Sequence, residues 1–393
     1  MFALAVSIGI LSYTLMGLGL VGWLNPTTIY ATLILVLLSV PPLLSPPKLG
    51  GETRRRGGIW WGLFSILFLQ ALVNLIGALG PELGFDALWY HTTIPKIWLA
   101  MHKITFLGGD LYYSGLPKLM DMLYVYPGAQ LIHFSFGILT LIVIYKLARK
   151  YLNNTYSLLA CIIFYSNLVV GWQSITAYID LGRTFFEILA LYLFLEKKYL
   201  QTAIILGLAV STKILSLGSL PIFIILGLPI AYCLVPILIV SPWLIFNWLS
   251  TGNPIYPIFS GYPIDWNFSL NILRLADPIN PIYIIILPFI ILSFSHFWVK
   301  YKLLIIYCTL SFVIWFLTPH TGGGRFLMPY LPAWSVLTAI LIQKNKFFVS
   351  LVIVLAIISI GYRGLANAKY MPHLLRIETE QEFLDKYLYH RFK

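Results

Sequence analysis

The chain of 393 residues is 59% hydrophobic, with a mean hydropathy of +0.86 and a formal net charge of +12. This composition exceeds what a soluble globular domain carries, and several apolar runs are long enough to cross a hydrocarbon core of about 30 Å. It excludes a soluble enzyme or binding module and predicts an all-α polytopic membrane protein.

Apolar segments separated by charged or Pro/Gly-rich breaks predict about thirteen transmembrane helices. The first segment lacks a basic n-region and precedes further spans, which predicts a retained helix and not a cleaved signal peptide. The three cysteines all lie within predicted spans, so they form no disulfide framework or zinc-binding spacing. In chain order the spans lie at roughly 2–22, 27–46, 59–79, 127–147, 155–173, 180–196, 201–217, 218–231, 232–249, 281–299, 303–318, 326–342 and 347–362.

Basic loops predict the orientation, because cytoplasmic loops of membrane proteins are enriched in Lys and Arg. If the N-terminus is cytoplasmic, the basic clusters near residues 48–56, 146–150, 197–198, 300–302 and 344–346 all face the cytoplasm. These loops hold 13 of the 26 basic residues and two of the 14 acidic residues. The net charge therefore reflects topology and contact with anionic lipid headgroups, and it requires no nucleic-acid partner.

The predicted organisation is one transmembrane domain, residues 1–362, with outer loops at 80–126 and 250–280 and an extracytoplasmic tail at 363–393. No repeat and no matching halves are visible in the sequence. Apolar and polar residues of 88–102 would separate onto two sides of a helix, which predicts an interfacial helix in the first loop. The tail pattern at 378–388 predicts a short amphipathic helix with a solvated acidic side.

Asp86 is the most informative residue, because a carboxylate where a span meets water is a functional candidate by default. It lies in the run Gly80-Pro81-Glu82-Leu83-Gly84-Phe85-Asp86-Ala87-Leu88-Trp89-Tyr90-His91 and is expected to end the third helix. Other charged residues are expected at the same outer level of the membrane, namely Asp180, Arg183, Glu187, Lys213, His320 and Arg325.

This set of residues suits transfer from a lipid phosphate. A carboxylate accepts a proton from an attacking hydroxyl, while Lys and Arg neutralise a departing phosphate. Asp86 and Asp180 are the candidate catalytic residues. The candidates for binding donor phosphate or substrate are Lys213, Arg325, His320, His91, Tyr90 and Lys96.

Each candidate also has a structural interpretation. Asp86 can be a solvated helix-end carboxylate, and Asp180 can cap the sixth helix. Lys213 can extend its ammonium to the headgroups without touching substrate. Arg183 and Glu187 are spaced i, i+4 and are favoured as a buried structural pair.

At these residues the chain resembles the GT-C glycosyltransferases that use polyprenyl-phosphate-linked sugars, which include protein O-mannosyltransferases and aminoarabinose transferases. The resemblance runs nearly end to end. It rests on Phe85-Asp86-Ala87-Leu88-Trp89-Tyr90-His91 with Pro95, on Tyr178-Ile179-Asp180, on Lys213, on Asn247-Trp248 with Thr251-Gly252-Asn253-Pro254-Ile255-Tyr256-Pro257, and on Arg325-Phe326-Leu327-Met328-Pro329-Tyr330-Leu331-Pro332.

The resemblance implies a GT-C-like fold in the plasma or inner membrane, with the site facing outside. It implies inverting transfer of a sugar from a polyprenyl-phosphate donor to the hydroxyl of a lipid, glycan or protein acceptor. Asp86 would be the general base, and Lys213, Arg325 and His320 would contact the donor phosphate. The paired acidic residues common in O-mannosyltransferases are here Asp86-Ala87, and no Asp-x-Asp occurs, so no bound metal or other cofactor is expected.

Two rival classes of function remain, namely a flippase or transporter of lipid-linked sugars and a non-catalytic membrane scaffold, and a glycan polymerase or ligase is the hardest alternative to exclude. A flippase or transporter of lipid-linked sugars would place ionisable residues near the midplane, where only Glu187 is expected. A glycan polymerase or ligase would share most of these features. A non-catalytic scaffold would not need two carboxylates and several cations at one level.

Overall fold

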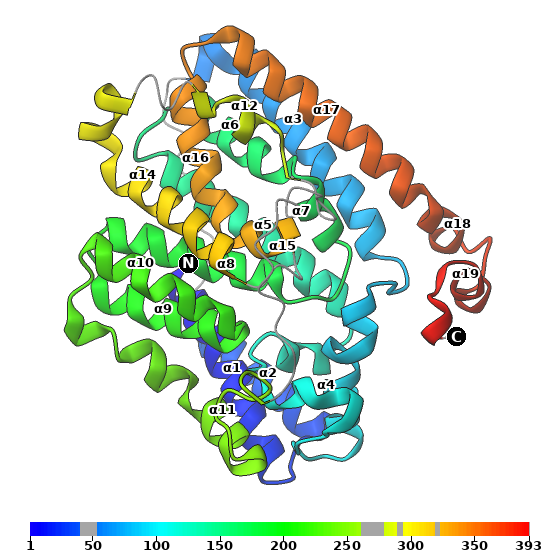
Figure 1. Ribbon diagram of the computed structural model, residues 1–393. Helices are drawn as coiled ribbons and strands as arrows, with labels where there is room; N and C mark the ends of the chain where they lie inside the picture. Colours follow the sequence, from blue (N-terminus) through cyan, green and yellow to red (C-terminus); the bar gives the residue numbers. More distant parts are fainter. Residues whose placement is uncertain (40–52, 261–278, 289–293, 319–322, 393) are drawn as a thin grey trace.

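The structure, a computed structural model, describes residues 1–39, 53–260, 279–288, 294–318 and 323–392, and every regular element in these ranges is a helix (Figure 1). The α-helices are α1 (Phe2–Leu20), α2 (Pro26–Ser39), α3 (Thr53–Ala78), α4 (Thr93–Ala100), α5 (Ala129–Ala148), α6 (Asn154–Tyr165), α7 (Leu168–Gln173), α8 (Asp180–Leu195), α9 (Tyr199–Thr212), α10 (Ser219–Leu226), α11 (Val235–Thr251), α12 (Ile282–Ile285), α14 (Phe294–Leu317), α15 (Gly323–Leu327), α16 (Leu331–Ile342), α17 (Lys346–Asn367), α18 (Met371–Leu374) and α19 (Glu380–Tyr387).

The chain is a multi-pass membrane protein, as its composition predicts. Seven helical segments of the described chain are long and apolar enough to cross a membrane. They are Phe2–Leu20, Gly58–Ala78, Ala129–Ala148, Ile230–Thr251, Trp298–Leu317, Gly323–Ile342 and Lys346–Leu374. Several further helices are apolar but shorter, so the total of about thirteen spans stays a prediction.

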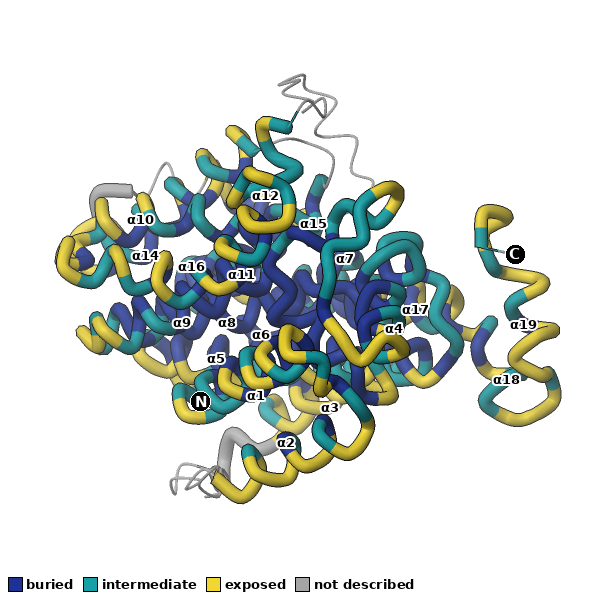
Figure 2. Tube along the Cα trace, turned by 90° about the horizontal axis from the view of Figure 1, so that it is seen from below, coloured by how far each residue is buried: buried dark blue, intermediate teal, exposed yellow. Residues whose placement is uncertain are grey.

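The centre of the molecule is α8, which packs between α5 and α9 (Figures 1 and 2). Of its 16 residues, 14 are buried, which suits a helix that is surrounded by other helices. Gly182 allows the first outer loop to approach, because a Cβ at this position would lie 2.6 Å from the sulfur of Met120. The first turns of α8 are therefore held against that loop.

Two predictions about helix ends are wrong. The third helix ends at Ala78, close to the predicted residue 79, but Asp86 does not lie at this end and instead directly precedes a π-helical turn at Ala87–His91. The span predicted at 155–173 is interrupted between α6 and α7, where the Asn167 amide donates to the carbonyls of Ile163 and Phe164. A side chain that satisfies the end of one helix locally favours a break that the apolar pattern does not show.

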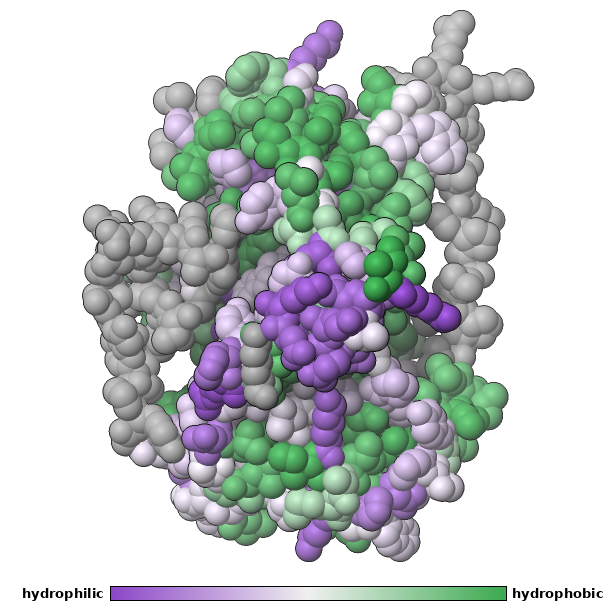
Figure 3. All heavy atoms as spheres, turned by 90° about the vertical axis from the view of Figure 1, so that its right-hand side faces the viewer, coloured by the Kyte–Doolittle hydropathy of each residue, from purple (hydrophilic) through white to green (hydrophobic). Residues whose placement is uncertain are grey.

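The first outer loop is structured, as expected, and contains α4 with short helical turns at Ala87–His91, Gly109–Gly115 and Asp121–Val125. The tail forms the predicted helix α19, which begins with a capping box between Thr379 and Glu382. On the face that carries the C-terminal helices, hydrophilic residues gather centrally between hydrophobic areas above and below (Figure 3). Most of the second outer loop lies outside the described residues.

The long helices α3 and α17 lie side by side, and Arg363 of α17 reaches from this pair to the break between α6 and α7. Its guanidinium donates to the carbonyls of Tyr165 and Asn167 and to Asn74 Oδ1. The side chain is buried. A cation thus bridges the break, because it donates to the carbonyl of the last residue of α6 and to that of Asn167, which also accepts the Gly171 amide.

We expect Arg363→Ala to lower the free energy of unfolding by about 2–4 kcal/mol, because buried carbonyls lose their donor. The measurement is the apparent melting temperature of the purified protein in lipid. Arg376→Ala, which removes the same side chain from an exposed position, is the control and should leave that temperature unchanged. An equal effect of both substitutions would contradict this account.

Candidate active site

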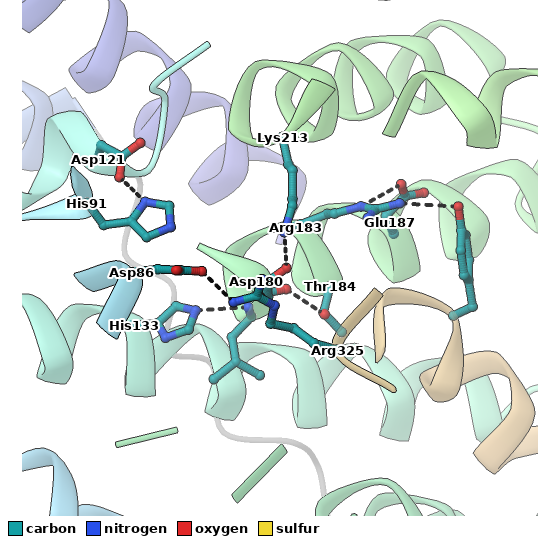
Figure 4. Close-up of polar contacts among 12 residues, drawn as sticks. Asp86, His91, Asp121, His133, Asp180, Arg183, Thr184, Glu187, Lys213 and Arg325 are labelled. Atoms are coloured by element: carbon teal, nitrogen blue, oxygen red, sulfur yellow. Dashed lines mark hydrogen bonds and ion pairs between the residues drawn. The ribbon is translucent and has the colours of Figure 1, made fainter. Parts of the chain in front are cut away.

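Four charged residues that are distant in sequence form one continuous chain of ion pairs (Figure 4). Arg325 Nη1 lies 2.7 Å from Asp86 Oδ2, and its Nε lies 4.0 Å from Asp180 Oδ2. Lys213 Nζ lies 2.6 Å from Asp180 Oδ1. The structure therefore brings together Asp86, Asp180, Lys213 and Arg325, four of the seven charged residues that were expected at one level of the membrane.

Helix ends position two of these side chains, Asp180 and Lys213. Asp180 begins α8, where a carboxylate is stabilised by the positive end of the helix dipole. Lys213 directly follows the last turn of α9, where a cation is stabilised by the negative end. Arg325 lies in the short helix α15, and Asp86 precedes the first turn of the outer loop. Opposite helix ends thus meet with opposite charges.

Aromatic rings enclose the two cations. The Arg325 guanidinium lies 5.2 Å from the ring centre of Tyr178 and 5.4 Å from that of Phe326. Lys213 Nζ lies 4.5 Å from the ring centre of Phe326. These faces attract cations while excluding water, so the cations keep their charge in a partly apolar setting.

The two carboxylates differ in accessibility. The side chain of Asp180 is 1% exposed, whereas those of Asp86, Arg325 and Lys213 are 17%, 15% and 16% exposed. Among the described residues, Asp180 Oδ2 and Arg325 Nε have no hydrogen-bond partner. The site therefore has one buried carboxylate, one accessible carboxylate and hydrogen-bonding capacity that its own side chains leave unused.

The segment 176–181, which leads into the first residues of α8, is held by Glu82 and His133. Glu82 Oε2 accepts the amide of Ala177 at 2.6 Å, and Glu82 Oε1 accepts that of Gly84 at 2.6 Å. His133 Nδ1 lies 2.7 Å from the Thr176 carbonyl oxygen, and His133 Nε2 accepts the Leu181 amide at 2.9 Å.

These contacts fix where Asp180 begins its helix. They were not predicted from the sequence. His133 is not among the candidate residues named from the sequence, yet both of its ring nitrogens bond to this segment. Glu82 was visible as a second acid in the first outer loop. His133 had no comparable signal, since its partners are more than forty residues away.

His91 and Tyr90 lie beside the ion pairs. His91 Nδ1 is 2.6 Å from Asp121 Oδ1, and Lys118 Nζ is 3.2 Å from Asp121 Oδ2. Lys118 Nζ also lies 5.2 Å from the ring centre of Tyr90. Burial lowers the pKa of His91 and outweighs Asp121. Burial alone would raise the pKa of Asp121, but Lys118 and His91 together lower it.

The remaining candidates are not part of the chain of ion pairs, or lie outside the described residues. Arg183 Nε lies 3.6 Å from Glu187 Oε1, which also accepts a hydrogen bond from Ser219. Both side chains are buried, an arrangement typical of a structural pair. Lys96 is exposed on α4, outside the chain of ion pairs. His320 lies outside the described residues. The described part of the chain contains no cluster of three His, Cys, Asp or Glu side chains suited to a metal ion.

Comparisons with known proteins agree with this fold. No family model matches the chain, and no curated protein matches it in sequence. Two crystal structures of ArnT from Cupriavidus metallidurans are similar, one in the apo state and one bound to undecaprenyl phosphate. Their TM-scores are 0.53 and 0.52, with 14% and 13% sequence identity, over 73% of this chain. The chain has a GT-C-type fold.

The resemblance to GT-C enzymes that the motifs predict is therefore confirmed at the level of the fold. The chain spans about 60% of the length of ArnT, to which it is similar. This similarity concerns the arrangement of helices. The roles of individual residues follow from the geometry of the site itself.

We expect Asp180→Asn to destabilise the protein by about 3 kcal/mol, the lower end for a buried pair, because it leaves the partly buried Lys213 ammonium without its partner. The double variant Asp180→Asn with Lys213→Met removes both charges and should recover most of this loss. Melting temperatures of the two single variants and the double variant measure the coupling. Additive losses would show that the pair is not coupled.

Stability should also depend on pH through Glu82, because burial raises its pKa from 4.5 to about 7. The folded protein then binds a proton more tightly than the unfolded chain, so the free energy of unfolding falls as the pH rises from 4.5 to about 7. Glu82→Gln should be less stable throughout, since it loses an acceptor for the loop, but its melting temperature should vary less over this window. An unchanged pH profile in Glu82→Gln would contradict the assignment.

Proposed function

We propose that this protein is a membrane glycosyltransferase that moves a sugar from a polyprenyl-phosphate donor to an acceptor hydroxyl. The observation that carries the proposal is the chain of ion pairs, in which two cations and an accessible carboxylate converge. The GT-C-type fold adds support, because ArnT, which shares it, has been crystallised with undecaprenyl phosphate. An inner-membrane location with the site facing outside completes the proposal.

The donor phosphate binds between the ammonium of Lys213 and the guanidinium of Arg325. Lys213 and Arg325 are 16% and 15% exposed, so a phosphate can reach both ammonium and guanidinium. The accessible part of Arg325 is its terminal guanidinium nitrogens, because Nε is buried and lies 4.0 Å from Asp180 Oδ2. When the bond between the anomeric carbon and the phosphate oxygen breaks, the electron pair leaves with the phosphate, and the two cations stabilise the developing charge.

Asp86 acts on the acceptor. In the structure its carboxylate is paired with Arg325 at 2.7 Å. A phosphate that binds Arg325 competes for this guanidinium and releases Asp86 as a free carboxylate. Asp86 then accepts the proton of the acceptor hydroxyl, whose oxygen attacks the anomeric carbon with inversion. Donor binding thus prepares the base.

Asp180 positions the cations. Its side chain is almost fully buried and bonds Lys213, so it has no path to an acceptor. Its Oδ2 lies 4.0 Å from Arg325 Nε, which keeps the two cations near each other before the donor arrives. We assign Asp180 to positioning, in place of the catalytic role expected from sequence.

The test is transfer from radiolabelled polyprenyl-phosphate sugars by the purified protein in lipid, with a panel of lipid, glycan and peptide acceptors. Asp86→Asn should lower kcat by about 10²–10⁴-fold, because proton transfer is lost. Arg325→Ala should lower kcat and raise the KM for donor. Arg376→Ala, which removes an exposed cation outside the ion pairs, should behave as wild type.

Undiminished transfer in both Asp86→Asn and Arg325→Ala would overturn the assigned roles. If no donor sugar is consumed while lipid-linked sugar crosses the bilayer of liposomes, the protein is a flippase and not a transferase. Products extended by whole oligosaccharide units would identify a polymerase or ligase.

A further inference from the structure

Four aromatic residues of the first outer loop, Phe85, Trp89, Tyr112 and Tyr113, form a surface that we name the aromatic shelf. The Trp89 ring centre lies 5.8 Å from that of Phe85, 6.2 Å from Tyr112 and 5.5 Å from Tyr113. All four side chains are half-buried. Trp89 Nε1 donates to the Asp110 carbonyl at 2.9 Å, which fixes the orientation of the indole ring.

The shelf adjoins the site. Phe85 directly precedes Asp86, and the Tyr113 ring packs 4.6 Å from that of Tyr90. Burial and the neighbouring Tyr112 raise the pKa of Tyr113. The charge of Asp86 raises this pKa further and that of Arg325 lowers it, because both charged groups lie near the Tyr113 hydroxyl. A molecule resting on the shelf therefore lies at the edge of the chain of ion pairs.

The end of the chain covers part of this surface. Tyr389 and Phe392 place their ring centres 5.8 and 5.3 Å from that of Phe85. The Arg391 guanidinium lies 5.7 Å from the ring centre of Phe85 and 5.3 Å from that of Trp89. Residues 389–392, which we name the terminal strap, thus occupy the outer part of the shelf.

The strap is held in a way that allows release. Its ion pair, Arg391 Nη2 to Asp110 Oδ2, is 3.8 Å long and joins side chains that are 50% and 90% exposed. Such a pair contributes little, because water screens it. The remaining contacts are ring edges and a cation over aromatic faces, which another flat molecule can replace.

We propose that the aromatic shelf binds a sugar ring of a carbohydrate acceptor, and that the terminal strap competes for this surface. Flat aromatic faces suit the C–H-rich face of a pyranose ring, while the rim of tyrosine hydroxyls and Asp110 supplies hydrogen bonds. The inference rests on the proposed function, since an acceptor hydroxyl must reach Asp86. A sugar on the shelf meets this requirement, because the shelf directly adjoins Asp86.

Direct binding tests the shelf. Protein in lipid nanodiscs, free of glycoside detergents, is titrated with maltotetraose and cellotetraose by saturation-transfer NMR. Trp89→Ala should weaken binding of at least one of them about three- to tenfold, the loss expected for an aromatic contact. Trp89→Phe should retain most of the affinity. Trp61→Ala, which removes the same side chain from an exposed aromatic group on α3, should bind as wild type.

A chain that ends at Leu388 tests the strap. It should bind the same oligosaccharides several-fold more tightly, and Arg391→Ala should shift affinity in the same direction. This arm stands even where Trp89→Ala does not fold. Absence of binding to both probes, an equal loss in Trp61→Ala, or unchanged affinity without the strap would each overturn the proposal.

Labelled-donor consumption, measured in the same nanodiscs, separates the two proposals. Donor consumption that depends on Arg325, without oligosaccharide binding, overturns the shelf proposal and leaves the transferase in place. Trp89-dependent binding of oligosaccharide without donor consumption overturns the transferase proposal and leaves the sugar-binding shelf in place. Transfer to Ser/Thr peptides in preference to glycans would also overturn the carbohydrate acceptor.

Discussion

The mutual neutralisation of four charged groups at one end of α8 is the interaction on which the rest of the site depends. Charges removed from water are costly unless each has a partner. Here Asp86, Arg325, Asp180 and Lys213 alternate in sign, so each charge lies beside an opposite one. In the proposed mechanism an anionic phosphate replaces Asp86 at Arg325, which links donor binding to release of the base.

The surrounding fold keeps this balance in place. Glu82 and His133 form hydrogen bonds with the segment that leads into α8. The position of Asp180 is therefore set by one residue from α5 and one from the start of the first outer loop. Arg363 has a similar role at the break between α6 and α7. In both places a buried polar side chain satisfies backbone groups where a helix begins or ends. The breaks that a membrane helix normally avoids are thereby stabilised by protein and not by water.

Much of the architecture could be predicted from sequence, because a hydrocarbon core imposes long apolar runs. The helical class and the GT-C-type fold followed from such runs and from short motifs. Breaks within an apolar span were harder to predict from the sequence. The apolar pattern predicted the end of the third helix to within one residue, but it did not predict the break in the span at 155–173, which depends on the local hydrogen bonds of Asn167.

The sequence by itself determined a polytopic helical chain and the identity of the charged residues near its outer boundary, because scarce charges in an apolar chain are conspicuous. Only the tertiary structure decided their partners. It joined Asp86 to Arg325 across 239 positions of sequence and gave His133 a positioning role. It also laid the terminal strap on the first outer loop. Pairing depends on how helices pack in three dimensions, and residue spacing along one chain carries no record of that contact.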